Sequence, residues 1–197
     1  MRFIGLICLL LIGVAEAREV TELRSYGEEA TSAIYVFTSP SCTHCRDYHK
    51  TIWPEIMKQF VRTGRAQLFV VDMPTSRGSM DISKIMRCLP EDKAEKLEGW
   101  IYENQSRWMD VQNPRNIFLQ YAQAVGMGLD AFNQCLADEN LEKTLIEQRN
   151  RLSALYSVRG TPTTVLRHGN VVKYYVGAER QAVLRGLDQD LQEFEKQ

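Results

Sequence analysis

The order of strand-like and helix-like segments restricts this chain to few folds. Residues 33–37 and 66–71 are short apolar runs rich in β-branched and aromatic residues, which predicts two buried strands with a helix between them. Residues 163–167 and 171–176 flank a His-Gly-Asn turn and predict a β-hairpin, and an amphipathic helix is expected over 181–194. A β-α-β unit followed by β-β-α predicts an α/β fold, in which helices flank a mixed sheet.

The stretch between the two groups of strands carries helical patterns only. Residues 76–157 are therefore expected to form an inserted all-helical domain, which packs against a sheet domain made from 18–75 and 158–197. Pro54 falls inside the helical pattern after the first strand and should kink that helix, because it has no backbone N–H. Residues 19–26 fit either a short helix or an irregular arm.

The N-terminus has the pattern of a secretory signal peptide. Arg2 precedes an apolar run over 3–14, and Ala15-Glu16-Ala17 offers small residues for cleavage. We expect residues 1–17 to be removed from an exported protein. The alternative is an uncleaved anchor, although the run is shorter than the roughly 20 residues of a membrane-spanning helix.

The charge balance argues against two classes of partner. Lys and Arg total 24 against 25 for Asp and Glu, so the formal net charge is −1, and like charges form no long run. This balance does not favour binding to nucleic acid or to an anionic membrane surface. The sequence has no Gly-rich phosphate loop, and we expect neither a metal nor an organic cofactor.

Cysteine usage predicts two pairs. The mature chain keeps Cys42, Cys45, Cys88 and Cys135, an even number in a protein sent to a compartment where disulfides persist. Four cysteines allow three connectivities. The chemistry expected of the Cys42–Cys45 spacing pairs those two cysteines, so Cys88 and Cys135 remain as the second pair. We expect a disulfide between inserted helices, with two buried free cysteines as the alternative.

Cys42-Thr43-His44-Cys45 lies where a buried strand is followed by a helix. Unpaired N–H groups and the positive end of the helix dipole would stabilise a thiolate at Cys42, and His44 would add a second positive or hydrogen-bonding group. Cys45, one turn later, could attack a mixed disulfide formed at Cys42. The alternatives are half of a zinc site or a purely structural disulfide, but Cys88 and Cys135 lack zinc-ligand spacing.

A second motif, Gly160-Thr161-Pro162-Thr163, immediately precedes a predicted strand. Taken alone, a proline at this position is usually an ordinary trans turn. Together with the strand, the C-x-H-C motif, the kinked helix and the helical insertion, however, the chain resembles the bacterial DsbA-like thiol-disulfide oxidoreductases of thioredoxin fold. The resemblance covers most of the mature chain. It implies that Pro162 is cis and packs against the active-site disulfide, and that the backbone of Thr161 bonds to an extended substrate peptide.

Two positions depart from the family pattern. Many DsbA-like proteins have proline where this chain has Thr43, and relatives often bury an acidic residue at the position of Val36 as a proton acceptor. His44 matches the more oxidising members, and the resemblance therefore favours an oxidant.

These observations predict a periplasmic, monomeric oxidase that donates its Cys42–Cys45 disulfide to unfolded or partly folded exported proteins. Its only redox group would be that disulfide, and the family pattern implies a membrane protein that reoxidises it. The alternatives are a disulfide reductase or isomerase, and a chaperone or peptide-binding module that uses its cysteines only structurally.

Overall fold

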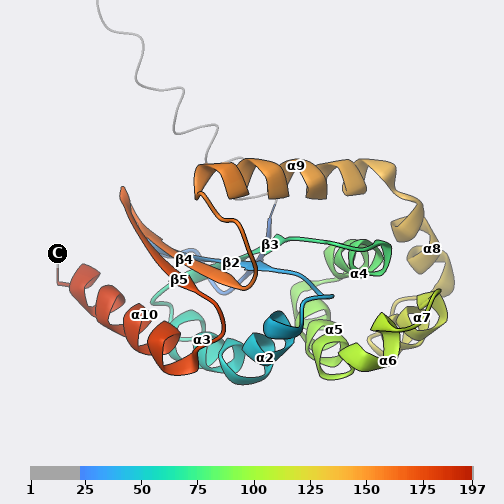
Figure 1. Cartoon of the computed structure of the whole chain (residues 1–197), viewed down its shortest axis with the longest axis horizontal. Coiled ribbons are helices and arrows are strands. Elements are labelled where there is room, and N and C mark those ends of the chain that lie inside the picture. The colour runs from blue at the N-terminus through green and yellow to red at the C-terminus, as the bar shows by residue number, and fades with distance from the viewer. Residues whose placement is uncertain (1–22, 197) are drawn as a thin grey trace, which may run out of the picture.

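A computed structural model describes residues 23–196, in which five strands form one mixed sheet (Figure 1). The strand order is β1-β3-β2-β4-β5. The strands β2 and β3 are parallel, and the other neighbouring pairs are antiparallel. The strands are β1 Arg24–Tyr26, β2 Ser32–Thr38, β3 Gln67–Asp72, β4 Thr163–His168 and β5 Val171–Val176.

Helices connect and cover these strands. Between β2 and β3 lie α2 Thr43–Thr51, α3 Trp53–Ile56 and the π-helix η1 Met57–Val61. Between β3 and β4 lie α4 Arg77–Arg87, α5 Glu91–Glu103, α6 Gln105–Met109, α7 Arg115–Ala124, α8 Leu129–Ala137 and α9 Glu139–Leu155. The last helix is α10 Arg180–Phe194.

Alternate residues of the central strand β2 face two different cores. Ile34 and Val36 are buried with α2, α3 and α10, whereas Tyr35 and Phe37 are buried with Leu152 at the end of α9 and with Tyr156, which follows it. Figure 1 shows α9 on one face of the sheet and α2, α3 and α10 on the other. Both faces are covered, which is why the strand reads as a continuous apolar run.

The helices α4, α5, α7 and α8 enclose a further core at one end of the molecule (Figure 1). Its fully buried members include Ile82, Ile101 and Phe118. The predicted α/β fold with a helical insertion is therefore confirmed. No helix in residues 23–196 has both the length and the apolar composition needed to cross a bilayer.

The expectation for residues 19–26 is wrong where the structure describes them. Arg24–Tyr26 is neither helix nor irregular arm but strand β1, in which Arg24 pairs with Val70 of β3. Three residues are too few to display an alternation of apolar and polar side chains, so only the pairing with β3 defines this strand. The predicted signal peptide, residues 1–17, lies outside the described residues.

The helical stretch is interrupted near Pro54, where the sequence predicted a kink. Helix α2 ends at Thr51, and Pro54 lies in the first turn of α3, where a missing N–H costs no helical hydrogen bond. The chain then continues as a π-helix, which the sequence pattern did not predict.

Candidate active site

Cys42 lies between the carboxyl end of β2 and the first turn of α2. Its backbone N–H donates to the carbonyl of Ser39 at 3.0 Å, which closes the turn after the strand. Cys42 itself is the N-cap residue, so its side chain faces the N–H groups that open the helix. The thiol is half-buried, whereas Cys45, in the first turn of α2, is fully buried. The structure contains both residues as free thiols.

Hydrogen bonds to its sulfur lower the pKa of Cys42 to about 5. The largest contribution comes from the Cys45 side chain, and the backbone N–H groups of Cys45 and His44 add to it, while partial burial opposes them. The N–H of Cys45 lies 3.3 Å from the Cys42 sulfur. A pKa near 5 makes Cys42 a thiolate at neutral pH, which is the nucleophilic form of cysteine.

Cys45 has the opposite character. Its hydrogen bond to the Cys42 sulfur and its burial both raise the pKa of the Cys45 thiol well above the ordinary value. One sulfur is thus a half-buried thiolate and the other a buried thiol, although only two residues lie between them.

The loop before β4 lies against Cys42. The Cys42 thiol is 3.5 Å from the carbonyl oxygen of Thr161, and the Thr161–Pro162 peptide bond is cis. Pro162 is buried, and its carbonyl accepts from the N–H of Gly177 at 2.9 Å. The fold therefore brings together Cys42, Cys45, Thr161 and Pro162, all of which the sequence analysis had singled out.

His44 contributes to this site through its backbone. Its side chain is exposed and makes no hydrogen bond or ion pair within residues 23–196. The group that acts on the Cys42 sulfur is the His44 backbone N–H. The electrostatic contribution expected from the imidazole therefore stays a prediction.

Gln105, from the helical insertion, supports the active-site turn and was missed in the sequence. Its buried side-chain amide donates to the carbonyl of Pro40 at 2.7 Å and to that of Cys42 at 2.9 Å. On the same turn, the hydroxyl of Ser41 lies 2.8 Å from that of Thr75, just before α4. Nothing in the sequence around this glutamine indicates that its side chain donates hydrogen bonds to carbonyl groups 65 and 63 residues away.

A buried polar cluster lies on the inner side of α2, behind Cys45. His49, one turn after Cys45, is stacked against Tyr102 with ring centroids 3.7 Å apart, and its Nε2 lies 3.4 Å from the hydroxyl of Thr38. The sequence analysis did not predict this cluster, which continues from His49 to Glu98, 3.9 Å away. Glu98 of α5 receives two hydrogen bonds from Arg24 of β1, at 2.6 and 2.9 Å.

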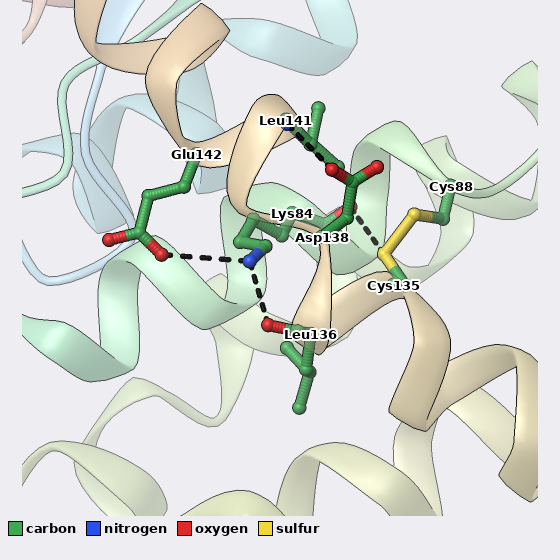
Figure 2. Close-up of a disulfide and its surroundings, with 7 residues drawn as sticks. All are labelled: Lys84, Cys88, Cys135, Leu136, Asp138, Leu141 and Glu142. Carbon is green, nitrogen blue, oxygen red and sulfur yellow. Dashed lines mark hydrogen bonds and ion pairs between the residues drawn. A yellow bond between two sulfur atoms is a disulfide. The ribbon is translucent and has the colours of Figure 1, made fainter.

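The Cys88–Cys135 disulfide joins the end of α4 to α8, remote in sequence from both motifs (Figure 2). This is the pairing predicted for the insertion, with an S–S distance of 2.03 Å. Figure 2 also shows the fully buried Lys84, one turn before Cys88, donating to the carbonyl of Leu136 at 2.7 Å and facing Glu142 at 3.6 Å. The disulfide and the lysine together fix α4 to the junction of α8 and α9.

A family model described as thioredoxin matches residues 19–181. The chain belongs to the thioredoxin family. Relatives in Rickettsia prowazekii and Rickettsia typhi, named as candidate protein-disulfide oxidoreductases, are each 24% identical over 166 residues. The match covers 83% of this chain in both cases, and 61% and 62% of the respective relatives. The chain thus spans about three fifths of the length of these thioredoxin-family relatives.

Solved structures of similar fold include alpha-DsbA1 from Wolbachia pipientis, with a TM-score of 0.77 and 14% identity over 86% of this chain and 90% of that one. DsbA from Chlamydia trachomatis has a TM-score of 0.71 and 20% identity, over 89% and 92% of the two chains. BdbD from Bacillus subtilis, in its oxidised form, has a TM-score of 0.74 and 16% identity, over 88% and 95%. These likenesses establish the DsbA-like variant of the thioredoxin fold, with its helical insertion.

Proposed function

We propose that this protein is a protein thiol-disulfide oxidoreductase in which Cys42 exchanges disulfides with substrate proteins. One observation carries the proposal: the half-buried Cys42 sulfur, with its lowered pKa, lies at the start of α2 and beside the Thr161 carbonyl. A purely structural disulfide would need neither an accessible thiolate nor an adjacent peptide loop. The candidate protein-disulfide oxidoreductases of Rickettsia support the same activity.

In the oxidising direction, a substrate thiolate attacks the Cys42 sulfur of the Cys42–Cys45 disulfide. The S–S bond breaks, Cys45 leaves as a thiolate and takes up a proton, and a mixed disulfide joins the substrate to Cys42. A second substrate thiolate then attacks the substrate's own sulfur, and Cys42 leaves as a thiolate. The substrate has lost two electrons and two protons, and the enzyme holds the dithiol.

The low pKa of Cys42 favours this direction over reduction. A thiol of low pKa is a good leaving group, and stabilisation of its thiolate favours the reduced enzyme over the disulfide. We therefore propose an oxidase, with a reductase or isomerase as the alternative. A protein-disulfide isomerase from Novosphingobium aromaticivorans shares the fold at 18% identity, with a TM-score of 0.69, and keeps that alternative open.

The loop at Thr161 and Pro162 is proposed to bind substrate. Its backbone borders the reactive sulfur, so an extended peptide paired with it would bring a substrate cysteine to Cys42. The substrates proposed are unfolded or partly folded exported proteins, and a membrane protein is proposed to reoxidise the enzyme. We also propose that the protein is exported to the periplasm, acts as a monomer and needs no cofactor beyond the disulfide.

An activity assay tests the proposal directly. The oxidised protein should introduce disulfides into a reduced, unfolded protein, and Cys42→Ser should abolish that activity. Equal performance of the wild type and Cys42→Ser would leave only a chaperone or peptide-binding role. Equilibration with glutathione buffers distinguishes the directions, because a potential near that of thioredoxin, about −270 mV, would make the protein a reductase.

A further inference from the structure

A surface groove of about 680 Å³ lies between α2 and α5, which pack side by side (Figure 1). Its walls come from three segments of the chain. The last turn of α2 contributes His49 and Lys50, the residue after η1 contributes Arg62, and α5 forms the rest. The exchange of disulfides at Cys42 assigns no role to this groove.

One side of α5 forms the long wall of the groove. The lining positions recur every three or four residues and therefore share a face of the helix; they are Asp92, Glu95, Lys96, Gly99, Trp100 and Glu103. Helix α5 runs antiparallel to the chain from α2 to η1. His49 is stacked on Tyr102 near the end of α5, whereas Arg62 pairs with Glu95, nearer its start, at 3.1 Å. The groove is thus a long channel between two antiparallel segments.

Gly99 keeps the middle of this groove open. It lies in the interior of α5, where glycine is the least favourable helical residue apart from proline. Packing does not require glycine here, because a Cβ built at this position would meet no atom of the described residues within 4 Å. A larger residue would stabilise the helix without a clash. The effect of this glycine is therefore to leave space in the groove, which is expected where a ligand binds.

The charges of the groove balance one another, and several lack a partner. The lining cations are Lys50, Arg62 and Lys96, and the lining anions are Asp92, Glu95 and Glu103. Within residues 23–196, the exposed side chains of Lys50, Asp92 and Glu103 make no hydrogen bond or ion pair. Lys96 lies over the ring of the half-buried Trp100, 5.0 Å from its centroid. A ligand that carries both signs of charge complements this lining, whereas a polyanion does not.

One end of the groove lies near the reactive sulfur. Gln105, two residues after Glu103, donates to the carbonyl of Cys42 at 2.9 Å. Lys50 follows Cys42 by eight residues, or about 12 Å along α2. An extended polypeptide spans that distance with about four residues. A chain whose cysteine reacts at Cys42 can therefore place a nearby segment in the groove.

We propose that the groove binds a segment of the substrate polypeptide that carries both acidic and basic side chains, about four residues or more from the reacting cysteine. The inference rests on the proposed function and names a second contact for the same substrate. Basic side chains of the segment pair with Asp92 and Glu103, and acidic side chains pair with Lys50. These contacts hold the substrate in either redox state, because none of them involves the cysteines.

A fluorescent peptide measures this binding without disulfide exchange. Its central cysteine is blocked by S-methylation, and segments of alternating Lys and Glu begin about four residues away on both sides. Gly99→Leu fills the middle of the groove and should weaken binding by about 10-fold or more, although leucine should raise the melting temperature by favouring the helix. Ala154→Leu, at an exposed position of α9 on the other face of the sheet, is the matched control and should bind like the wild type.

A change of charge provides an independent test. The wild type should bind the mixed peptide more tightly than peptides whose segments contain only Glu or only Lys. Asp92→Lys combined with Glu103→Lys makes the lining cationic, so this variant should bind the all-Glu peptide more tightly than the mixed one. If Gly99→Leu does not fold, the charge variant decides the question alone.

The outcomes separate this groove from the proposed function. Unchanged binding in a folded Gly99→Leu, or equal affinity of the wild type for the three peptides, would overturn the assignment of the groove. Disulfide transfer to a short cysteine peptide without charged segments should keep its wild-type rate in Gly99→Leu. Failure of the wild type in that transfer would instead count against the proposed function.

Discussion

The sulfur of Cys42 and the carbonyl oxygen of Thr161 lie 3.5 Å apart, although 119 residues separate them in the sequence. The central position of β2 explains this contact. Since β2 pairs with β4, the carboxyl end of one strand adjoins the start of the other, and Phe37 lies opposite Thr163. The reactive thiol and the loop proposed to hold substrate are thus set by the same pair of strands.

The pKa of Cys42 should depend on Cys45 more than on the His44 ring. We expect Cys45→Ala to raise the pKa of Cys42 from about 5, because the side chain that contributes most is removed. His44→Ala should raise it less, since the backbone N–H that contributes remains. Ultraviolet absorbance of the thiolate, followed against pH, measures both variants. A larger rise in His44→Ala than in Cys45→Ala would contradict this order.

The reduced protein should be more stable than the oxidised protein at neutral pH. The pKa of Cys42 is lowered from 9.0 to about 5 on folding, so between these values the unfolded dithiol chain binds more protons than the folded one. The stability contributed by the thiolate is complete above pH 9 and is lost as the pH falls through about 5. Denaturant unfolding of both redox forms between pH 4 and 8 measures the difference. A difference that does not shrink toward pH 4 would contradict this origin.

Loss of the Gln105 amide should destabilise the active-site turn. Gln105→Leu leaves the carbonyls of Pro40 and Cys42 buried without this donor, which we expect to cost about 1–3 kcal/mol of the free energy of unfolding. Gln123→Leu, at an exposed position of α7, is the matched control and should change stability by less than about 0.5 kcal/mol. Equal effects of the two substitutions would mean that the contact carries no stability.

The second disulfide should stabilise the fold. In the chain-entropy account, closing a loop of 47 residues restricts the unfolded chain by about 4 kcal/mol. Replacing both Cys88 and Cys135 with Ala should lower the free energy of unfolding by about that amount. Both proteins are first prepared with Cys42 and Cys45 reduced. A reductant strong enough to open the Cys88–Cys135 disulfide should then destabilise the wild type and leave the stability of the double variant unchanged.

Strands β2 to β5 and the cysteines of the candidate active site could be predicted because their signals are local. The apolar composition of residues 33–37 predicts a strand buried on both faces. Two cysteines with two residues between them, at the start of the next helix, indicate thiol-disulfide chemistry without further context. Gln105 and the pair Arg24 and Glu98 have no such local signature. The contacts between Arg24 and Glu98 and those of Gln105 join residues 63 or more positions apart, so only the folded chain shows their role.

The location of the helical insertion also has a consequence for the growing chain. Strand β2 lies between β3 and β4, and β4 is made only after α4 to α9. During synthesis, therefore, one edge of the central strand has no partner until Thr163–His168 emerges. An apolar strand with an unpaired edge attracts other extended chains, so the nascent protein depends on late residues to close its own aggregation-prone edge.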